Sequence, residues 1–150
     1  MESGILTVAN SFTMSGENGF NVSGSASPVA GTNNGSVSAT TGTFTYGGNL
    51  TFNFTGAGVS GATYDLFNTT GATLGSASFT SVSIAGSYAS AFTNSSGIWS
   101  ATVGGLNWAF TEATGDLVLT TAIPEPSTWA ALAGLSGLAF AAGRRRRRAA

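Results

Sequence analysis

The chain has 150 residues and a formal net charge of −1, but its few charges are very unevenly placed. Charged residues make up 7% of the sequence, against about 25% in an ordinary globular protein. All five cations are arginines at positions 144–148, so the rest of the chain offers nothing to nucleic acid phosphates. The absence of Cys and His excludes disulfides, imidazole or thiolate metal sites and nucleophile–histidine catalysis.

The sequence of the first third of the chain predicts short strands and loops. Residues 5–9 have the pattern of a strand, and the stretch SGSASPVAGTNNGS is a loop by composition. Further along, Leu50, Phe52 and Phe54 alternate with polar residues. Alternation with a period of two predicts a strand with one buried face.

The middle of the chain continues this pattern with less regularity. Tyr64 and Leu66 flank Asp65, which is expected to face outward. Apolar residues then fall at Phe79, Val82 and Ile84, and the phase slips by one position. Such a slip is typical of a β-bulge, so a bulged strand is expected here.

The clearest local prediction is a three-stranded meander in GIWSATVGGLNWAFTEATGDLVLTT. Gly104-Gly105 is a two-residue hairpin turn, and a turn over residues 112–115 follows the second strand. These turns set the pairing and place the apolar residues of all three strands on one face. The expected opposite pairs are Val103 with Leu106, Ala101 with Trp108, Trp99 with Phe110, Phe110 with Leu117, and Trp108 with Leu119.

The fold class expected from these patterns is all-β. An antiparallel meander or β-sandwich and the end of a β-solenoid both fit, because each reads as short alternating strands with glycine turns. The expected organisation is a Gly/Ser/Thr-rich β domain over residues 1–121, a linker over 122–126, a transmembrane helix over 127–143 and an arginine-rich cytoplasmic tail over 144–150.

The transmembrane helix is expected because residues 126–143 carry no charge. As a helix, these 18 residues would span roughly 27 Å, slightly less than a hydrocarbon core of about 30 Å. Positive residues beside a span stay in the cytoplasm, so the cluster Arg144, Arg145, Arg146, Arg147 and Arg148 would leave the β domain outside. A buried helix followed by a solvated charge run is the alternative.

The C-terminus resembles a known sorting signal. Pro124, Glu125 and Pro126 precede Ser127-Thr128-Trp129, an apolar span and the arginine cluster. This order is similar to the PEP-CTERM sorting signal of bacterial envelope proteins. The resemblance implies that an exosortase, a membrane-embedded cysteine transpeptidase-like enzyme, recognises Pro124, Glu125, Pro126 and Ser127 as substrate residues. It further implies that the tail is removed and the body passes to the cell surface or matrix.

Proteins with this signal normally carry an N-terminal secretion signal, and MESGILTVANSFTMSGENGF has neither a basic nor an apolar leader region. Either the chain is a fragment of a longer exported protein or its start has been assigned too late in the sequence, and we favour a fragment. The phrases TYDLFNTTG and SFTSVSIAG also resemble the last segment of proteins with autotransporter-associated β-strand repeats, in which a β-helix runs into a sorting tail.

Several side chains are candidates for chemistry, each with a plainer interpretation beside it. Glu112 and Asp116 are the only acids close in sequence, and could bind a cation or act as paired carboxylates; a solvated turn is the simpler reading. Trp99 and Trp108 could stack on a sugar, whereas the meander pairing favours a place in the core. Asn-x-Ser/Thr sequences, which suit glycosylation, occur at Asn21, Asn34, Asn49, Asn53, Asn68 and Asn94.

The function expected from the sequence is that of a noncatalytic exported envelope or biofilm-matrix protein with a structural or adhesive role. Its partners would be the exosortase and the lipid bilayer, with no cofactor, no metal and no nucleic acid. It would stay in the inner membrane transiently before reaching the surface. The alternative is a carbohydrate-binding module that uses exposed aromatics or an Asn/Thr-rich sheet face to bind an exopolysaccharide. An enzyme has little support without His or Cys.

Overall fold

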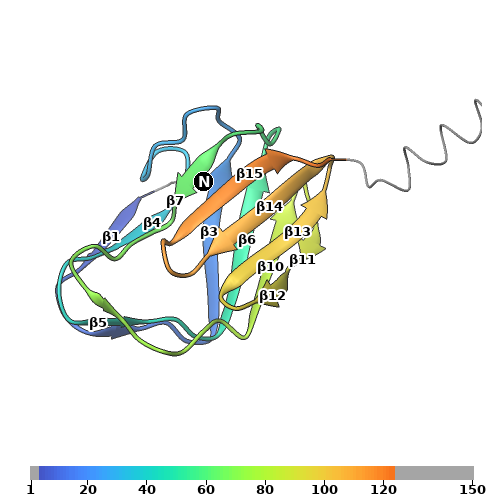
Figure 1. The fold of residues 1–150 in the computed structure, drawn as a ribbon. Coiled ribbons are helices and arrows are strands. Elements are labelled where there is room, and N and C mark those ends of the chain that lie inside the picture. The colour runs from blue at the N-terminus through green and yellow to red at the C-terminus, as the bar shows by residue number, and fades with distance from the viewer. Residues whose placement is uncertain (1–3, 124–150) are drawn as a thin grey trace, which may run out of the picture.

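The computed structural model describes residues 4–123, which contain fifteen strands and no helix (Figure 1). The all-β class is therefore confirmed. The helix expected over 127–143 and the tail over 144–150 lie outside the described residues, and no described element is a helix long and apolar enough to cross a membrane. The strands are β1 (Ile5–Val8), β2 (Phe12–Thr13), β3 (Glu17–Ser23), β4 (Ser36–Ala39), β5 (Thr43–Thr45), β6 (Asn49–Thr55), β7 (Thr63–Asp65), β8 (Phe67–Asn68), β9 (Thr73–Leu74), β10 (Ser81–Gly86), β11 (Ser90–Ala91), β12 (Thr93–Ser95), β13 (Ile98–Val103), β14 (Leu106–Thr111) and β15 (Asp116–Thr121).

The first ten strands are mostly arranged as parallel stacks. The stacks are β1-β4-β8, β2-β5-β9 and β3-β6-β10, and β11 adds an antiparallel edge to the third. Ile5 pairs with Ser36, Phe12 with Phe44, and Glu17 with Asn49. The chain therefore returns to the same place about every 31 residues, which is the repeat of a β-solenoid coil.

The last strands form the antiparallel meander that the sequence predicts. In the β13–β14 pair, Trp99 lies opposite Phe110 and Val103 opposite Leu106. In the β14–β15 pair, Leu119 lies opposite Trp108. All five predicted pairs are confirmed. Strand β12 extends the meander on one side and β7 on the other.

The meander packs across the inner face of the β3-β6-β10 stack, as seen in Figure 1. Phe52 meets Phe110 with ring centroids 5.6 Å apart, and Phe54 meets Trp108 edge to face at 4.9 Å. The described fold thus joins coils of parallel strands to an antiparallel meander, two arrangements that the sequence left as alternatives.

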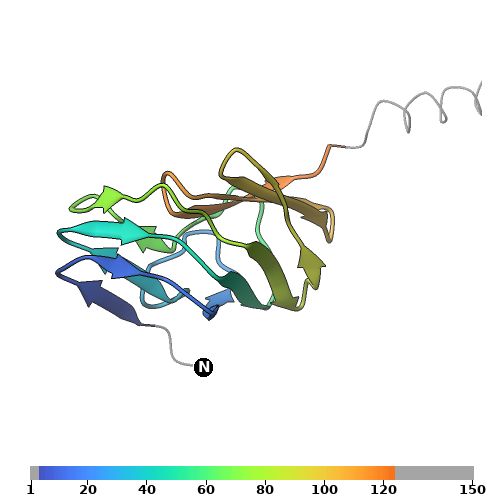
Figure 2. The same cartoon turned by 90° about the horizontal axis from the view of Figure 1, so that it is seen from below.

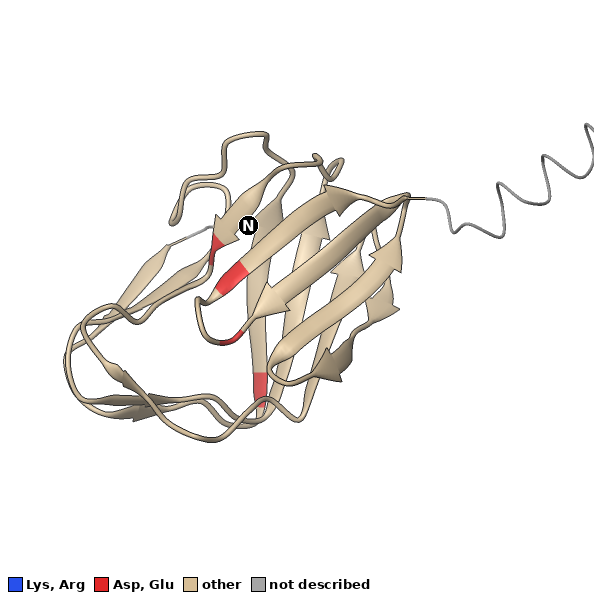
Figure 3. Ribbon diagram, viewed as in Figure 1, with Lys and Arg blue, Asp and Glu red and all other residues tan. Residues whose placement is uncertain are grey.

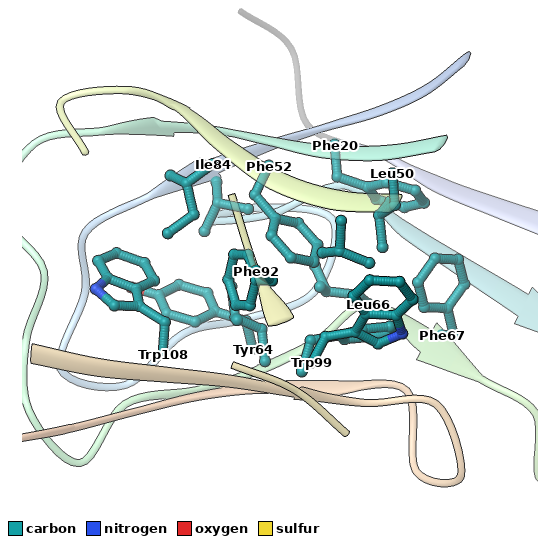
Figure 4. Packing of buried hydrophobic residues seen from close by; sticks show 14 of the residues in the cluster. Phe20, Leu50, Phe52, Tyr64, Leu66, Phe67, Ile84, Phe92, Trp99 and Trp108 are labelled. Carbon is teal, nitrogen blue, oxygen red and sulfur yellow. The ribbon is translucent and has the colours of Figure 1, made fainter. Parts of the chain in front are cut away.

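One continuous apolar core lies between these sheets. Leu50, Phe52 and Phe54 have no exposed surface, which confirms the predicted alternation. Figure 4 shows side chains from both walls meeting in the space between them. Each large side chain buried in this way contributes about 1.5–3 kcal/mol from removal of apolar surface from water, so the described residues need no disulfide to form a core.

The bulged strand that the sequence predicts around Phe79 does not form, so this prediction was wrong. Strand β10 begins at Ser81, and its Val82 and Ile84 alternate without interruption. Phe79 is buried in the preceding loop instead, where its N–H donates to the Glu112 carboxylate at 3.0 Å. The phase slip in the sequence therefore marks a strand boundary.

Candidate functional site

The chain leaves the β domain at the end of β15. The Ala122 N–H donates to the Gly105 carbonyl at 3.0 Å, and Ile123 is 84% exposed. The expected sorting residues Pro124, Glu125, Pro126 and Ser127 follow at once but lie outside the described residues, as do Arg144, Arg145, Arg146, Arg147 and Arg148. The described domain therefore ends on an exposed residue directly before the expected recognition element.

Glu112 is a buried structural carboxylate, so its interpretation as a solvated turn residue was wrong. It is 9% exposed. Its Oε1 accepts hydrogen bonds from the Ser78 hydroxyl at 2.6 Å, the Phe79 N–H at 3.0 Å and the Trp99 Nε1–H at 2.9 Å. These donors replace water around the carboxylate. Glu112 thus connects the β9–β10 loop to the meander.

Tyr46 reinforces the same junction. Its hydroxyl donates to the Glu112 carbonyl at 2.9 Å. Burial raises the pKa of Tyr46 well above its ordinary range, and the negative charges of Glu112 and Asp116 raise it further. The phenol therefore stays protonated and keeps its hydrogen bond at any ordinary pH.

The structure pairs Asp116 with Asp65 rather than with Glu112. The two aspartates lie directly opposite each other in the β7–β15 pair. Burial raises the pKa of Asp65, and the charge of Asp116 adds to the effect. Asp65 is half-buried, so the expectation that it faces outward holds only in part. Asp65 and Asp116 line an open hollow of about 450 Å³. The other lining residues are Asn68, Thr69, Thr70, Ala72, Leu74, Ala113 and Thr114.

This hollow contains two carboxylates and several neutral oxygen groups. Residues 4–123 contain no group of three or more acidic side chains that could hold a metal ion. The Asp65 Oδ1 is buried without a hydrogen-bond partner among the described residues. The facing carboxylates of Asp65 and Asp116 therefore destabilise the described fold locally.

Both tryptophans proposed as glycan contacts lie in the core. Trp99 is 5% exposed and donates to Glu112, while Trp108 has no exposed surface and donates to the Val103 carbonyl at 3.2 Å. Neither ring presents a face to a sugar. The assignment of Trp99 and Trp108 as glycan contacts therefore gives way to the core assignment that the strand pairing favoured.

The outer face of the β3-β6-β10 stack carries polar side chains in rows. Glu17 accepts from the Asn49 amide at 2.6 Å, and the Ser81 hydroxyl donates to Asn49 at 2.8 Å. In the next row, the Thr51 and Ser83 hydroxyls are 3.1 Å apart. Because residues at the same coil position stack in register, this face is an array of hydroxyl and amide groups with one charge.

The glycosylation sequences differ in accessibility. Asn68 and Asn94 are exposed, whereas Asn21, Asn49 and Asn53 are half-buried within the rows on β3 and β6. Asn34 has no exposed surface, and its amide donates to the Asp65 carbonyl at 2.7 Å. The Asn34 sequence is therefore closed to modification in the folded domain.

The charges of the described domain are all negative, as Figure 3 shows: residues 4–123 include no Lys or Arg.

The described residues form an all-β domain of stacked coils and a meander. Residues 122–148 match the family model of the PEP-CTERM protein-sorting motif. The C-terminal segment therefore carries a PEP-CTERM sorting motif, which indicates exosortase-dependent sorting of an exported protein that passes through the membrane. Neither the curated proteins nor the solved structures include a match.

Sequence reasoning left the solenoid coils as one of two alternatives without placing their strands, and it missed the buried role of Glu112. A signal for the coils is present at an offset of 32 residues, where Phe20-Asn21 aligns with Phe52-Asn53 and Phe12 with Phe44. No comparable local pattern indicates that Glu112 is buried, because two of its three donors, Ser78 and Phe79, come from a loop more than thirty residues earlier.

Proposed function

We propose that this chain is a noncatalytic structural or adhesive protein of the bacterial envelope or biofilm matrix, held in the inner membrane by its C-terminal segment until an exosortase removes that segment. The observation that carries the proposal is the match of residues 122–148 to the sorting motif, directly after a domain without cations. The buried roles of Glu112 and the two tryptophans support a structural domain over a catalytic one.

The chemistry of the tail fits temporary retention. Leu132, Leu135, Leu138 and Phe140 are its strongly apolar residues, and each contributes only about −0.3 to −0.6 kcal/mol to insertion. The arginine cluster holds its own end on the cytoplasmic side, with roughly 1 kcal/mol of attraction per arginine to an anionic leaflet. Pro124 and Pro126 flank Glu125, and proline disfavours a helix at the residue before it, a sequence preference that suits recognition of a peptide by the exosortase.

The decisive experiment is to express the full chain in cells with and without the exosortase and to measure intact mass and membrane fractionation. We expect a shortened, released product only when the exosortase is present. A variant with Pro124, Glu125 and Pro126 all replaced by alanine should stay full-length in the membrane, whereas Glu17→Gln should be processed normally. A full-length chain that is unchanged in both cells and washes off membranes would contradict the proposal.

Membrane orientation is a separate test. Single cysteines in the β domain and beside the arginines, placed in a chain that has no natural Cys, report the side of the membrane through an impermeant thiol reagent. We expect labelling of Ile98→Cys from outside and no labelling of Ala149→Cys. Labelling of both residues from the same side of the membrane would contradict the proposed orientation.

A carbohydrate-binding role is the second candidate, favoured by the polar rows on the outer face of β3, β6 and β10. Neutral hydroxyl and amide groups in register suit a neutral polysaccharide, since they offer donors and acceptors without charge. Polysaccharide pull-down should then weaken in Thr51→Val and Asn53→Ala. Thr102→Val, whose hydroxyl bonds Asn107 on the meander, is the matched control. Absence of binding by the intact chain would remove this candidate.

A further inference from the structure

The end of the domain at which the chain leaves is a surface built from three segments. The Ala122 N–H donates to the Gly105 carbonyl at 3.0 Å, and the Ser60 and Thr121 hydroxyls are 2.8 Å apart. Figure 1 and Figure 2 both place the end of β15 at one extremity of the domain. We call this surface the exit face, and it consists of residues 56–61, 104–105 and 121–123.

Tyr88 holds the exit face in place from inside the domain. Its hydroxyl accepts a hydrogen bond from the Gly58 N–H at 2.9 Å, and its ring packs against Trp108 with centroids 5.0 Å apart. The turn at Gly104 lies directly against the same ring, because a Cβ there would be 2.3 Å from it. The exit face is therefore a fixed part of the fold.

The exit face carries no charged side chain and ends on an exposed apolar one. Ile123 is 84% exposed, more than any other large apolar side chain in residues 4–123. Removing such a side chain from water is favourable. A partner surface with an apolar layer would therefore stabilise Ile123.

The acidic side chains of the meander and β7 lie at the other end of their strands. Asp116 begins β15 and Thr121 ends it, so strand geometry separates them by roughly 17 Å. Asp65 lies directly opposite Asp116. Glu112 follows the end of β14 that is farther from the turn 104–105. These three acids are therefore remote from the exit face.

Glu17, the remaining acid of residues 4–123, is equally remote. It begins β3, whose other end is level with the end of β6, directly before the loop 56–61. Figure 3 shows all four acidic residues away from the end of β15. Charges farther from a surface than a Debye length of about 8 Å are largely screened. An anionic membrane therefore repels the domain least when the exit face is the part nearest to it.

The short connection limits how far the exit face can lie from the membrane. With the span beginning at residue 127, as in the proposed function, only residues 123–126 separate it from Ala122. The chain from Ala122 to residue 127 extends over at most about 18 Å. The headgroup layer on each side of the hydrocarbon core is roughly 5–8 Å thick. Ala122 is therefore within roughly 10–13 Å of the headgroups.

We propose that, before cleavage, the domain lies with its exit face toward the phospholipid headgroups and with Ile123 at the membrane interface. This proposal rests on the proposed anchoring of the C-terminal segment. The short connection brings the exit face to the membrane, and the position of the four acids selects this end over the others. The sorting motif then begins at the membrane surface, where a membrane-embedded exosortase can reach it.

Fluorescence quenching in lipid vesicles tests this orientation with the full chain, which has no natural Cys. Ala57→Cys on the exit face and Ala113→Cys in the turn at the opposite end are a matched pair, since both alanines are exposed. Each carries a bimane label in vesicles of phosphatidylcholine and phosphatidylglycerol that include a lipid with a nitroxide on its headgroup. We expect quenching at Ala57→Cys to exceed that at Ala113→Cys by roughly threefold or more, because the two ends are roughly 17 Å apart.

The role of Ile123 is tested in the Ala57→Cys background. Ile123→Ser removes the apolar side chain at the proposed interface, and we expect quenching to fall by roughly twofold. Ile98→Ser is the matched control, because Ile98 is also exposed but pairs with Thr111 at the opposite end of the meander. It should leave quenching unchanged. Circular dichroism verifies that each variant is folded.

Three results would overturn the proposal: quenching at Ala113→Cys that equals or exceeds that at Ala57→Cys, no quenching at either label, or no effect of Ile123→Ser. Washing the same vesicles with sodium carbonate reports anchoring separately. A chain that washes off would overturn the proposed anchoring and this orientation with it. A chain that stays anchored with equal quenching at both labels would overturn the orientation alone.

Discussion

Asp65 and Asp116 lie directly opposite each other on neighbouring strands, so two negative groups face each other in the β7–β15 pair. Burial and then the charge of Asp116 raise the pKa of Asp65 from its ordinary value of 3.8. The native state therefore holds the Asp65 proton more tightly than the unfolded state does. Ionisation of Asp65 therefore destabilises the fold, and this cost grows as pH rises from the ordinary pKa of 3.8 to the raised pKa and is constant above it.

Asp116→Asn should consequently stabilise the domain at pH 7. Like charges at directly opposite positions in a sheet are destabilising, and the expected gain is a few tenths to about 1 kcal/mol. The gain should disappear below pH 3.8, where both states hold the Asp65 proton. Urea unfolding at pH 7 and pH 3 measures it, and Glu17→Gln, a change at a distant exposed acid, is the control. A gain that is the same at both pH values would contradict the electrostatic explanation.

Glu112 should be among the most sensitive acidic residues for stability. Glu112→Ala leaves three donors without their acceptor, those of Ser78, Phe79 and Trp99. The expected loss is at least about 2 kcal/mol. Glu112→Gln retains the accepting Oε1 and should lose less. Denaturant unfolding followed by tryptophan fluorescence compares them, and equal losses would show that the hydrogen bonds at Oε1 are unimportant.

The two glycines of the β13–β14 turn should respond differently to alanine. Both have positive φ, 63° at Gly104 and 73° at Gly105, so either substitution costs about 1–2 kcal/mol in backbone strain. A Cβ at Gly104 would lie 2.3 Å from the Tyr88 ring, whereas one at Gly105 meets nothing within 4 Å. Gly104→Ala should therefore destabilise by about 1 kcal/mol more than Gly105→Ala, measured by thermal unfolding. Equal costs would mean that Tyr88 moves aside freely.

Phe54 should couple the coils to the meander. Its ring meets Trp108 at 4.9 Å with an interplanar angle of 89°. Phe54→Ala should cost about 3–5 kcal/mol, with the same unfolding midpoint by tryptophan fluorescence and by far-ultraviolet circular dichroism. Separate midpoints would show that the coils and the meander unfold independently, contrary to a shared core.

The meander could be predicted pair by pair because its information is local. Once Gly104-Gly105 is taken as the turn, each opposite residue follows by counting, and the alternation of apolar side chains confirms the register. The same reasoning placed Leu50, Phe52 and Phe54 in the core. Short turns and a period of two are properties of neighbouring residues, which a sequence displays directly.

The parallel coils were harder because their partners are separated by a whole coil. Leu6, Val37 and Phe67 share one stacking position, yet they have in common only that they are apolar. The pairing of Asp65 with Asp116 has the same origin, since it joins residues about fifty positions apart. Such contacts arise from the path of the chain in space and leave little trace in local composition.

The exposed exit after Ala122 separates the fate of the tail from the stability of the domain. Every strand, buried aromatic side chain and backbone hydrogen bond of the described fold precedes Ile123. Cleavage beyond this point by the proposed exosortase would leave all of these described elements in the product. The shortened product should melt at the same temperature as its precursor while losing every guanidinium that the precursor carries.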